Sequence, residues 1–216
     1  MKFNIGTTEI ASQSTGGTRL AANTIHNVKF DGAEAVTIDK KDGSASFDVL
    51  RLKFKNDEGT FEHVIFEPKA GDDVRQKNQF DSDNPSNLEN LIFTIKHLLV
   101  AVAPTVAKQI EDKGILVDGW NGDKGLRQFV VKNTEKAKGA ETQIKLLSDK
   151  DNNPQFPGFP LGMSKEGNVY PRTNFIGKDL KFTPAEIKRM NSVATATPSR
   201  PAASATTSAE DDDLVF

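Results

Sequence analysis

Ser46-Phe47-Asp48-Val49-Leu50-Arg51-Leu52-Lys53-Phe54-Lys55 is the stretch of sequence that most clearly indicates how this chain folds. Successive side chains of a strand point to opposite faces of a sheet, so Leu50, Leu52 and Phe54 share one apolar face. The opposite face carries Arg51, Lys53 and Lys55, together with Phe47 and Val49. The stretch therefore predicts a strand with one face in a core and the other face rich in cations.

Further strands are predicted on both sides of this stretch. Residues 25–30 and 36–38 alternate apolar and polar side chains around Asp31-Gly32, which predicts two short strands joined by a tight turn. Alternation predicts another strand over residues 60–66. Two more are predicted over Arg127–Lys132 and Thr142–Leu147, and an extended segment over residues 169–182.

Helices are indicated by capping signals and by apolar residues at helical spacing. Ser86-Asn87-Leu88-Glu89 is a capping box, and apolar residues at spacings of three and four follow it as far as Val102. Pro104 is expected to start a second short helix that stops at Gly114. Thr183-Pro184-Ala185-Glu186 opens a last helix, which is expected to end near Asn191.

This order of strands, a long helix and more strands favours a mainly β, α+β protein. It is typical of an OB-type antiparallel barrel with a long inserted helix after the third strand. A doubly wound α/β sheet is disfavoured, because it needs repeated strand–helix alternation. We expect a flexible arm over residues 1–22, an OB-like domain over 23–190, and a disordered linker with an acidic tip over 191–216.

Composition narrows the class of protein. The 216 residues include no Cys, which excludes disulfides, thiol catalysis and Cys-ligated metals. Net charge is −2, and the tail from residue 191 carries −3, which leaves +1 on the body. The body therefore lacks the strongly basic surface that is typical of nucleic-acid-binding proteins. The absence of a long apolar run predicts a soluble cytoplasmic protein without membrane association.

The chain ends in a cluster of acids followed by apolar residues, Glu210-Asp211-Asp212-Asp213-Leu214-Val215-Phe216. A solvated acidic end that aids solubility is one interpretation. The other is a peptide ligand, in which Asp211, Asp212 and Asp213 pair with cations at the rim of a partner's pocket. Leu214 and Phe216 would then fill that pocket. The apolar end favours the ligand, because a solubilising tail has no need of it.

The tip resembles the C-terminal end of bacterial and phage single-stranded DNA-binding proteins, in which a run of Asp precedes an apolar residue and a final Phe. Val215 stands where the bacterial pattern commonly has Pro. The long helix and long loops favour a phage-type member, which would act in the host cytoplasm. The resemblance implies an OB-fold body that protects single strands in replication, recombination and repair. It also implies a tip that recruits a polymerase, helicase or primase and competes with DNA for the protein's own groove.

Binding a single strand without sequence preference requires cations for phosphates and exposed rings for bases. The candidate DNA-binding residues are Lys29, Phe47, Arg51, Lys53, Lys55, Trp120, Lys132, Tyr170 and Arg172. The strand residues among them could instead form a solvated face with Phe47 in a secondary core. Trp120 could be a core anchor, although its flanking glycines favour partial exposure. The remaining Phe residues that we assign are expected in the core or in packing: Phe54, Phe66, Phe93, Phe156 and Phe159.

Metal binding and catalysis find little support. Asp149, Asp151 and Asn153 imitate the start of a calcium loop, but Pro154 occupies the position where that loop needs Gly. We therefore expect no metal, no cofactor and no catalytic residue. Two alternatives to DNA binding remain, a scaffolding protein whose tail docks to an assembly partner and a metal-dependent nuclease. The nuclease would use the loop carboxylates Asp72, Asp73, Asp81 and Asp83. The sequence leaves a homo-oligomer open.

Overall fold

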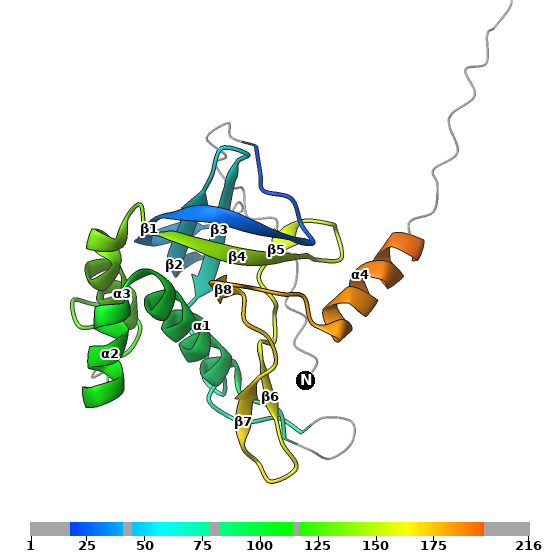
Figure 1. Ribbon diagram of the computed structural model, residues 1–216. Helices are drawn as coiled ribbons and strands as arrows, with labels where there is room; N and C mark the ends of the chain where they lie inside the picture. Colours follow the sequence, from blue (N-terminus) through cyan, green and yellow to red (C-terminus); the bar gives the residue numbers. More distant parts are fainter. Residues whose placement is uncertain (1–17, 41–44, 78–82, 115–116, 197–216) are drawn as a thin grey trace, which may run out of the picture.

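The computed structural model describes residues 18–40, 45–77, 83–114 and 117–196, which form a curled antiparallel half-barrel sheet with helices packed beside it (Figure 1). The sheet has the order β3-β2-β1-β4-β5, and β8 also pairs with β4. Its strands are β1 (Thr24–Asp39), β2 (Ser46–Lys55), β3 (Thr60–Phe66), β4 (Glu141–Ser148), β5 (Pro154–Gln155) and β8 (Ile176–Gly177). The fold is therefore mixed α+β, as the sequence predicts.

The other elements lie outside this sheet. They are α1 (Asn87–Val102), α2 (Pro104–Lys113), α3 (Leu126–Thr134), the single turn η1 (Glu135–Ala137), the strands β6 (Leu161–Met163) and β7 (Val169–Pro171), and α4 (Pro184–Ala196). Strands β6 and β7 form a separate hairpin that projects below the half-barrel in Figure 1. Helix α4 projects to the right of the sheet in the same view (Figure 1).

Strand β1 is the shared strand of the sheet, and the prediction of two short strands around a turn is wrong here. Lys29 pairs with Lys55 of β2 and with Glu141 of β4, so β1 changes from one neighbour to the other near this point. The register to β2 then slips between Phe30 and Gly32, which leaves Asp31 as an unpaired bulge residue. A bulge bends a strand and increases its twist. The Asp31-Gly32 signal therefore marks a bend within one strand.

The bulge also reverses which residues of β1 face the core. Val28 and Phe30 are buried before it, whereas beyond it Ala33 is paired with the buried Leu52. Val36 and Ile38 are consequently paired with Val49 and Phe47 on the outer face of the sheet. Side chains of a strand alternate between two faces, and one extra residue exchanges the faces of all residues that follow it. The alternation read from Val28 and Phe30 therefore assigns Val36 and Ile38 to the wrong face.

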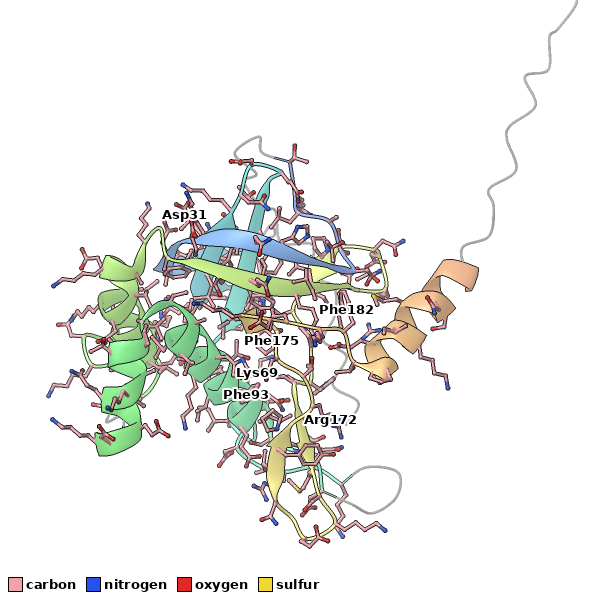
Figure 2. The ribbon with its side chains drawn as sticks, viewed as in Figure 1. Asp31, Lys69, Phe93, Arg172, Phe175 and Phe182 are labelled. Carbon is pink, nitrogen blue, oxygen red and sulfur yellow. The ribbon has the colours of Figure 1, made fainter. Side chains whose placement is uncertain are left out.

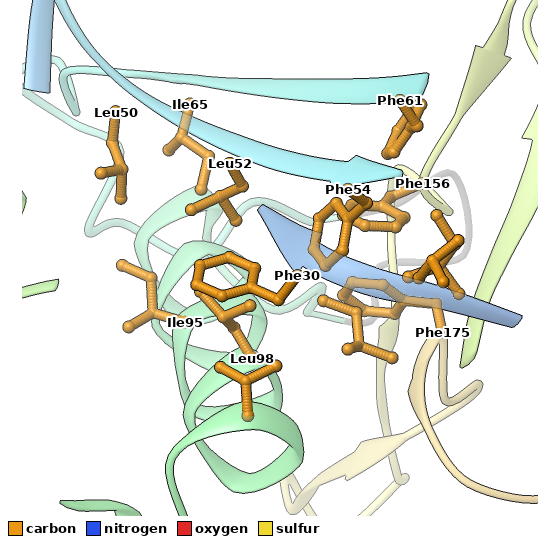
Figure 3. Packing of buried hydrophobic residues seen from close by; sticks show 14 of the residues in the cluster. Phe30, Leu50, Leu52, Phe54, Phe61, Ile65, Ile95, Leu98, Phe156 and Phe175 are labelled. Carbon is orange, nitrogen blue, oxygen red and sulfur yellow. The ribbon is translucent and has the colours of Figure 1, made fainter. Parts of the chain in front are cut away.

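The prediction for β2 is confirmed, and its apolar face meets α1 in the core. Leu50, Leu52 and Phe54 are fully buried, and Figure 3 shows them packed with Phe30 and with Leu98 of α1. The rings of Phe30 and Phe54 meet edge to face at a centroid distance of 5.6 Å. Burial of large apolar side chains such as these contributes about 1.5–3 kcal/mol each to folding. The concave face of the half-barrel therefore holds the hydrophobic core.

Both capping boxes that the sequence predicts are present. The Ser86 hydroxyl accepts a hydrogen bond from the Glu89 N–H at 3.1 Å, and the Glu89 carboxylate accepts one from the Ser86 N–H at 2.7 Å. Thr183 and Glu186 exchange the same pair of hydrogen bonds at the start of α4. Helix α2 also begins at Pro104 and is followed by Gly114. Helix α4 continues to Ala196, beyond its expected end.

The predicted strand over Arg127–Lys132 is wrong, because this segment is helix α3. Val130 and Thr134 are buried, which is the i, i+4 spacing of one helix face. Arg127 further holds this helix to the sheet, since its guanidinium donates hydrogen bonds to the backbone oxygens of Val36 and Val49 at 3.1 and 3.2 Å. Tertiary packing overrides the β propensity of the short run Phe129-Val130-Val131.

The prediction of a flexible arm is wrong for its last residues, 18–22, which pack against the domain. Leu20 is buried in the core, and its N–H donates a hydrogen bond to the Thr60 carbonyl at 3.1 Å. The Thr60 N–H in turn donates to the Thr18 carbonyl at 2.8 Å. Among the helices that the structure describes, none is long and apolar enough to cross a membrane.

A buried ion pair fixes the start of α4 to β4. The Lys145 ammonium is fully buried and donates hydrogen bonds to the Glu186 carboxylate at 2.8 Å, to the Lys181 carbonyl at 2.9 Å and to the Thr173 hydroxyl. The Thr173 hydroxyl donates to the other Glu186 oxygen at 2.8 Å. Burial works to raise the pKa of Glu186, but hydrogen bonds from Lys145, the Thr183 backbone and Thr173 lower it overall. All three ammonium protons are satisfied.

Replacing Glu186 with Gln should destabilise the protein by about 3–5 kcal/mol, because Lys145 would remain buried without a counter-charge. Gln retains an oxygen that can accept from the Thr183 N–H, so the helix cap survives the change. The measurement is the free energy of unfolding in urea. The double variant Lys145→Met/Glu186→Gln should recover most of the loss, since it removes both charges and keeps the same helix cap. A loss in the double variant as large as in Glu186→Gln would contradict this account.

Candidate nucleic-acid interface

The predicted basic face of β2 is present, but carboxylates neutralise its cations. Lys53 lies 2.7 Å from Glu34 and Lys55 lies 2.7 Å from Asp31. Arg51 lies 3.6 Å from Glu62 on the neighbouring strand β3. Lys29 has no ion pair among the described residues, but Glu141 is its cross-strand neighbour. This face therefore offers little net positive potential to a phosphate backbone.

The aromatic residue predicted on the same face is half-buried. The Phe47 ring packs edge to face against Phe66 at a centroid distance of 5.9 Å, and the Lys40 ammonium lies 5.4 Å from its centre. Phe66 is 42% exposed, so its assignment to the core is wrong. The core is on the concave face, whereas Phe66 is paired with Val49 on the outer face. Phe47 and Phe66 thus form a small apolar cluster on the outer face.

Trp120 and Lys132 do not join this face. Trp120 is only 6% exposed and its indole N–H donates to the Asp48 carbonyl at 2.8 Å, so the expected partial exposure is wrong. The flanking glycines serve the turns of the loop, where Gly119 and Gly122 have positive φ. Lys132 is exposed on α3, and its ammonium lies 3.5 Å from the Asp123 carbonyl. A base cannot stack on Trp120 in this arrangement.

The β6–β7 hairpin brings the last two predicted residues together. Tyr170 is cross-strand from Gly162, and an added Cβ at Gly162 would lie 2.7 Å from the Tyr170 ring and 2.6 Å from Arg172 Nε. Both side chains therefore lie over the bare backbone of Gly162. Tyr170 and Arg172 are both exposed, and the Arg172 guanidinium has no hydrogen bond or ion pair to any described residue. Figure 2 shows Arg172 on the hairpin, far from Asp31 on the sheet.

Phe159 extends this aromatic surface, and its assignment as a packing residue is wrong. It is 64% exposed, whereas Phe156 three residues earlier is buried against Phe61 and Phe175. Val74 and Val169 are also exposed in this region, so half of the large exposed apolar side chains of the described chain belong to the hairpin and the adjoining loops. Of these two Phe residues, Phe156 packs in the core, whereas the segment Pro157-Gly158-Phe159-Pro160 leaves the Phe159 ring at the surface.

A cavity of about 340 Å³ lies beside this surface, between the loop before α1, the first turn of α1 and the hairpin. Buried residues Ser86, Asn90 and Leu161 contribute to it, and the exposed Phe159 and Arg172 line it as well. Asn90 joins the walls: its side-chain oxygen accepts from the Leu161 N–H at 3.3 Å, and its amide donates to the Ser86 carbonyl at 2.9 Å. The hairpin is thus fixed to α1 by one buried amide.

Two histidines in the aromatic core add no positive charge at neutral pH. Burial lowers the pKa of His63 to about 4, and this ring packs against Phe61 and Phe156. Burial also lowers the pKa of His97, which lies between Phe93 and Phe175. Phe175 is fully buried beside these rings, so it does not join Tyr170 and Arg172 at the surface. Neither of these two histidines therefore contributes to the positive charge of the surface.

The described residues contain no group of three or more His, Asp or Glu that could hold a metal ion. The Asp149 carboxylate instead accepts hydrogen bonds from the backbone N–H groups of Asp151 and Asn153, both at 2.8 Å, and closes its own loop. Asp72 serves a similar purpose, because its carboxylate accepts from the Lys69 N–H and from the Asn87 amide. Asp81 and the tip residues Asp211, Asp212, Asp213, Leu214 and Phe216 lie outside the described residues.

Comparison with known proteins adds no relative, because no family model, no curated protein and no solved structure matches this chain. The candidate interface therefore depends on geometry alone. The hairpin residues Tyr170 and Arg172 are the predicted pair that the fold brings together at an exposed site. Phe159 was not predicted as part of an interface, although the flanking Pro and Gly were an available signal of a surface segment.

Substituting Gly162 should displace Tyr170 and Arg172 without unfolding the protein, because the groups in the way are surface side chains. Tyr170 is the only tyrosine, so its ring protons give an isolated NMR signal. We expect Gly162→Val to shift that signal strongly while changing stability by about 1 kcal/mol or less. Gly158→Ala is the matched control, since nothing lies within 4 Å of its added Cβ. An unchanged tyrosine signal in Gly162→Val would contradict the close approach.

Proposed function

We propose that this chain binds single-stranded DNA without catalysing a reaction, through the exposed end of the molecule around the β6–β7 hairpin. The observation that carries the proposal is the pairing of Tyr170 and Arg172 over Gly162. An exposed ring beside an unpaired guanidinium provides a stacking surface for a base and a cation for its phosphate. Phe159 offers a second ring face on the same surface.

The arrangement of the sheet supports an OB-type barrel as the body of such a protein. The central strand β1 pairs with both β2 and β4, and α1 lies between β3 and β4 in the sequence. The OB-fold, a partly open five-stranded barrel, binds oligonucleotides on its strands and loops in many proteins. The fold alone does not assign the function, so the proposal depends on the hairpin surface.

The acidic tip completes the proposal. Asp211, Asp212 and Asp213 followed by an apolar end have the chemistry of a peptide that docks in a basic-rimmed pocket. We propose that the tip recruits proteins of DNA replication, recombination or repair. We further propose that its charge competes with DNA for the cations of the body, which carries only +1 overall.

Tyr170→Ala should weaken binding to a labelled oligo-dT by about 5-fold or more, because stacking contributes roughly 1–3 kcal/mol per base, and Arg172→Ala should weaken it through the loss of a phosphate contact. The measurement is fluorescence anisotropy at low salt, and Arg172→Ala should also reduce the slope of log K against log salt by about 0.7. Arg51→Ala is the matched control, because this Arg on β2 already faces Glu62. It should change affinity less than about 2-fold.

Two outcomes would overturn this assignment. Equal losses in Arg51→Ala and Arg172→Ala would place the interface away from the hairpin. If the protein fails to bind single strands at low salt even after deletion of residues 210–216, the DNA-binding proposal itself is wrong. If the same exposed apolar surface binds a protein instead, that binding should depend little on salt. Such a result would favour the scaffolding alternative.

Deletion of residues 210–216 should tighten DNA binding several-fold at low salt, and the difference should disappear near 1 M salt as charge is screened. The double variant Leu214→Ala/Phe216→Ala keeps the acids, so it should leave DNA affinity unchanged. Both variants should lose capture of partner proteins, which is measured by pull-down with purified replication proteins. Weaker DNA binding after the deletion would contradict competition by the tail.

A further inference from the structure

The cavity beside the hairpin contains polar groups that the fold itself does not use. Gln76 and Asn84 line it, and neither side-chain amide has a hydrogen-bond partner among the described residues. Their backbones are joined, because the Asn84 N–H donates to the Gln76 carbonyl at 2.8 Å. This bond holds two primary amides next to each other in the cavity wall. Each amide offers two N–H donors and one acceptor oxygen.

The neighbouring helix end is already satisfied and does not supply the binding groups. Ser86 and Glu89 occupy the capping box of α1, and the Asn87 amide donates to Asp72 at 2.8 Å. The Asn90 amide is also already hydrogen-bonded, because its oxygen accepts from the Leu161 N–H of the hairpin and its nitrogen donates to the Ser86 carbonyl. The groups left for a ligand are therefore the Gln76 and Asn84 amides, the Arg172 guanidinium and the Phe159 ring.

These four groups match the parts of one nucleotide. A flat ring accepts a base by stacking, and a guanidinium pairs with a phosphate. A primary amide can hydrogen-bond a base edge through a donor and an acceptor together, and Asn and Gln make this bidentate contact with adenine. Recognition of an unstacked base by stacking and edge hydrogen bonds is the usual way in which proteins read single strands. A cavity of about 340 Å³ leaves room for a purine base.

We propose that this cavity takes one unstacked adenine of the bound strand and gives the protein a base preference at that position. Phe159 stacks on the adenine ring, Asn84 and Gln76 contact its edge, and Arg172 holds the adjoining phosphate. The inference rests on the proposed single-strand binding, but it adds a specificity that stacking and charge alone do not supply. The part-buried Asn84 amide gains its missing partners when the base enters.

The test compares oligo-dT with the same oligonucleotide carrying one central adenine, in competition anisotropy with the full-length protein. The adenine oligonucleotide should bind at least about 5-fold more tightly, which is the lower end of the discrimination of a bidentate amide contact. Asn84→Ala and Gln76→Ala should remove this preference and leave affinity for oligo-dT within about 2-fold. Asn168→Ala is the matched control, because this Asn lies in the hairpin turn outside the cavity. It should keep the preference.

The possible results separate this inference from the proposed function. Equal wild-type affinity for the two oligonucleotides overturns the adenine pocket and leaves single-strand binding standing. A preference that persists in both Asn84→Ala and Gln76→Ala also overturns it. Binding of free dAMP by a protein that binds neither oligonucleotide overturns the strand-bound assignment and the DNA-binding proposal together. Thermal unfolding of each variant confirms that the fold is intact.

Discussion

The bulge at Asp31 is the constraint on which the sheet depends. It bends β1 where the strand passes from pairing with β4 to pairing with β2, so one strand forms part of both halves of the half-barrel. Phe30 and Phe54 are cross-strand partners just before the bulge, and their rings meet within the curve, where Leu98 of α1 packs beside Phe30 (Figure 3). A flat pairing through this point would place the residues beyond Asp31 on the opposite faces and would open the core.

The same core determines where the candidate interface lies. Helix α1 packs into the curved sheet, and its buried Asn90 then holds the hairpin by the Leu161 N–H. This attachment sets Tyr170 and Arg172 beside the cavity before α1. The hairpin contributes little to the hydrophobic core, but its position follows from the packing of α1 against β2. A surface site is thus oriented by a buried hydrogen bond on a core helix.

Charge along the sequence is a poor guide to charge on the surface of this protein. Arg51, Lys53 and Lys55 form the most regular basic pattern of the chain, yet Glu62, Glu34 and Asp31 face them across the strands. Exposed pairs of this kind contribute only about 0–1 kcal/mol to stability, but they cancel the local potential. Arg172, by contrast, is an isolated basic residue in the sequence, and its guanidinium has no hydrogen bond or ion pair to any described residue.

Elements that depend on neighbouring residues could be predicted from the sequence. Both capping boxes, the strand β2 with its apolar face and the helix α1 could be predicted, because each is specified by residues a few positions apart. Tertiary structure decided what depends on contacts across the chain: the helical state of α3, the burial of Trp120 and the exposure of Phe159. It also decided that Tyr170 and Arg172 lie together over Gly162, since that approach requires two strands to pair in one register.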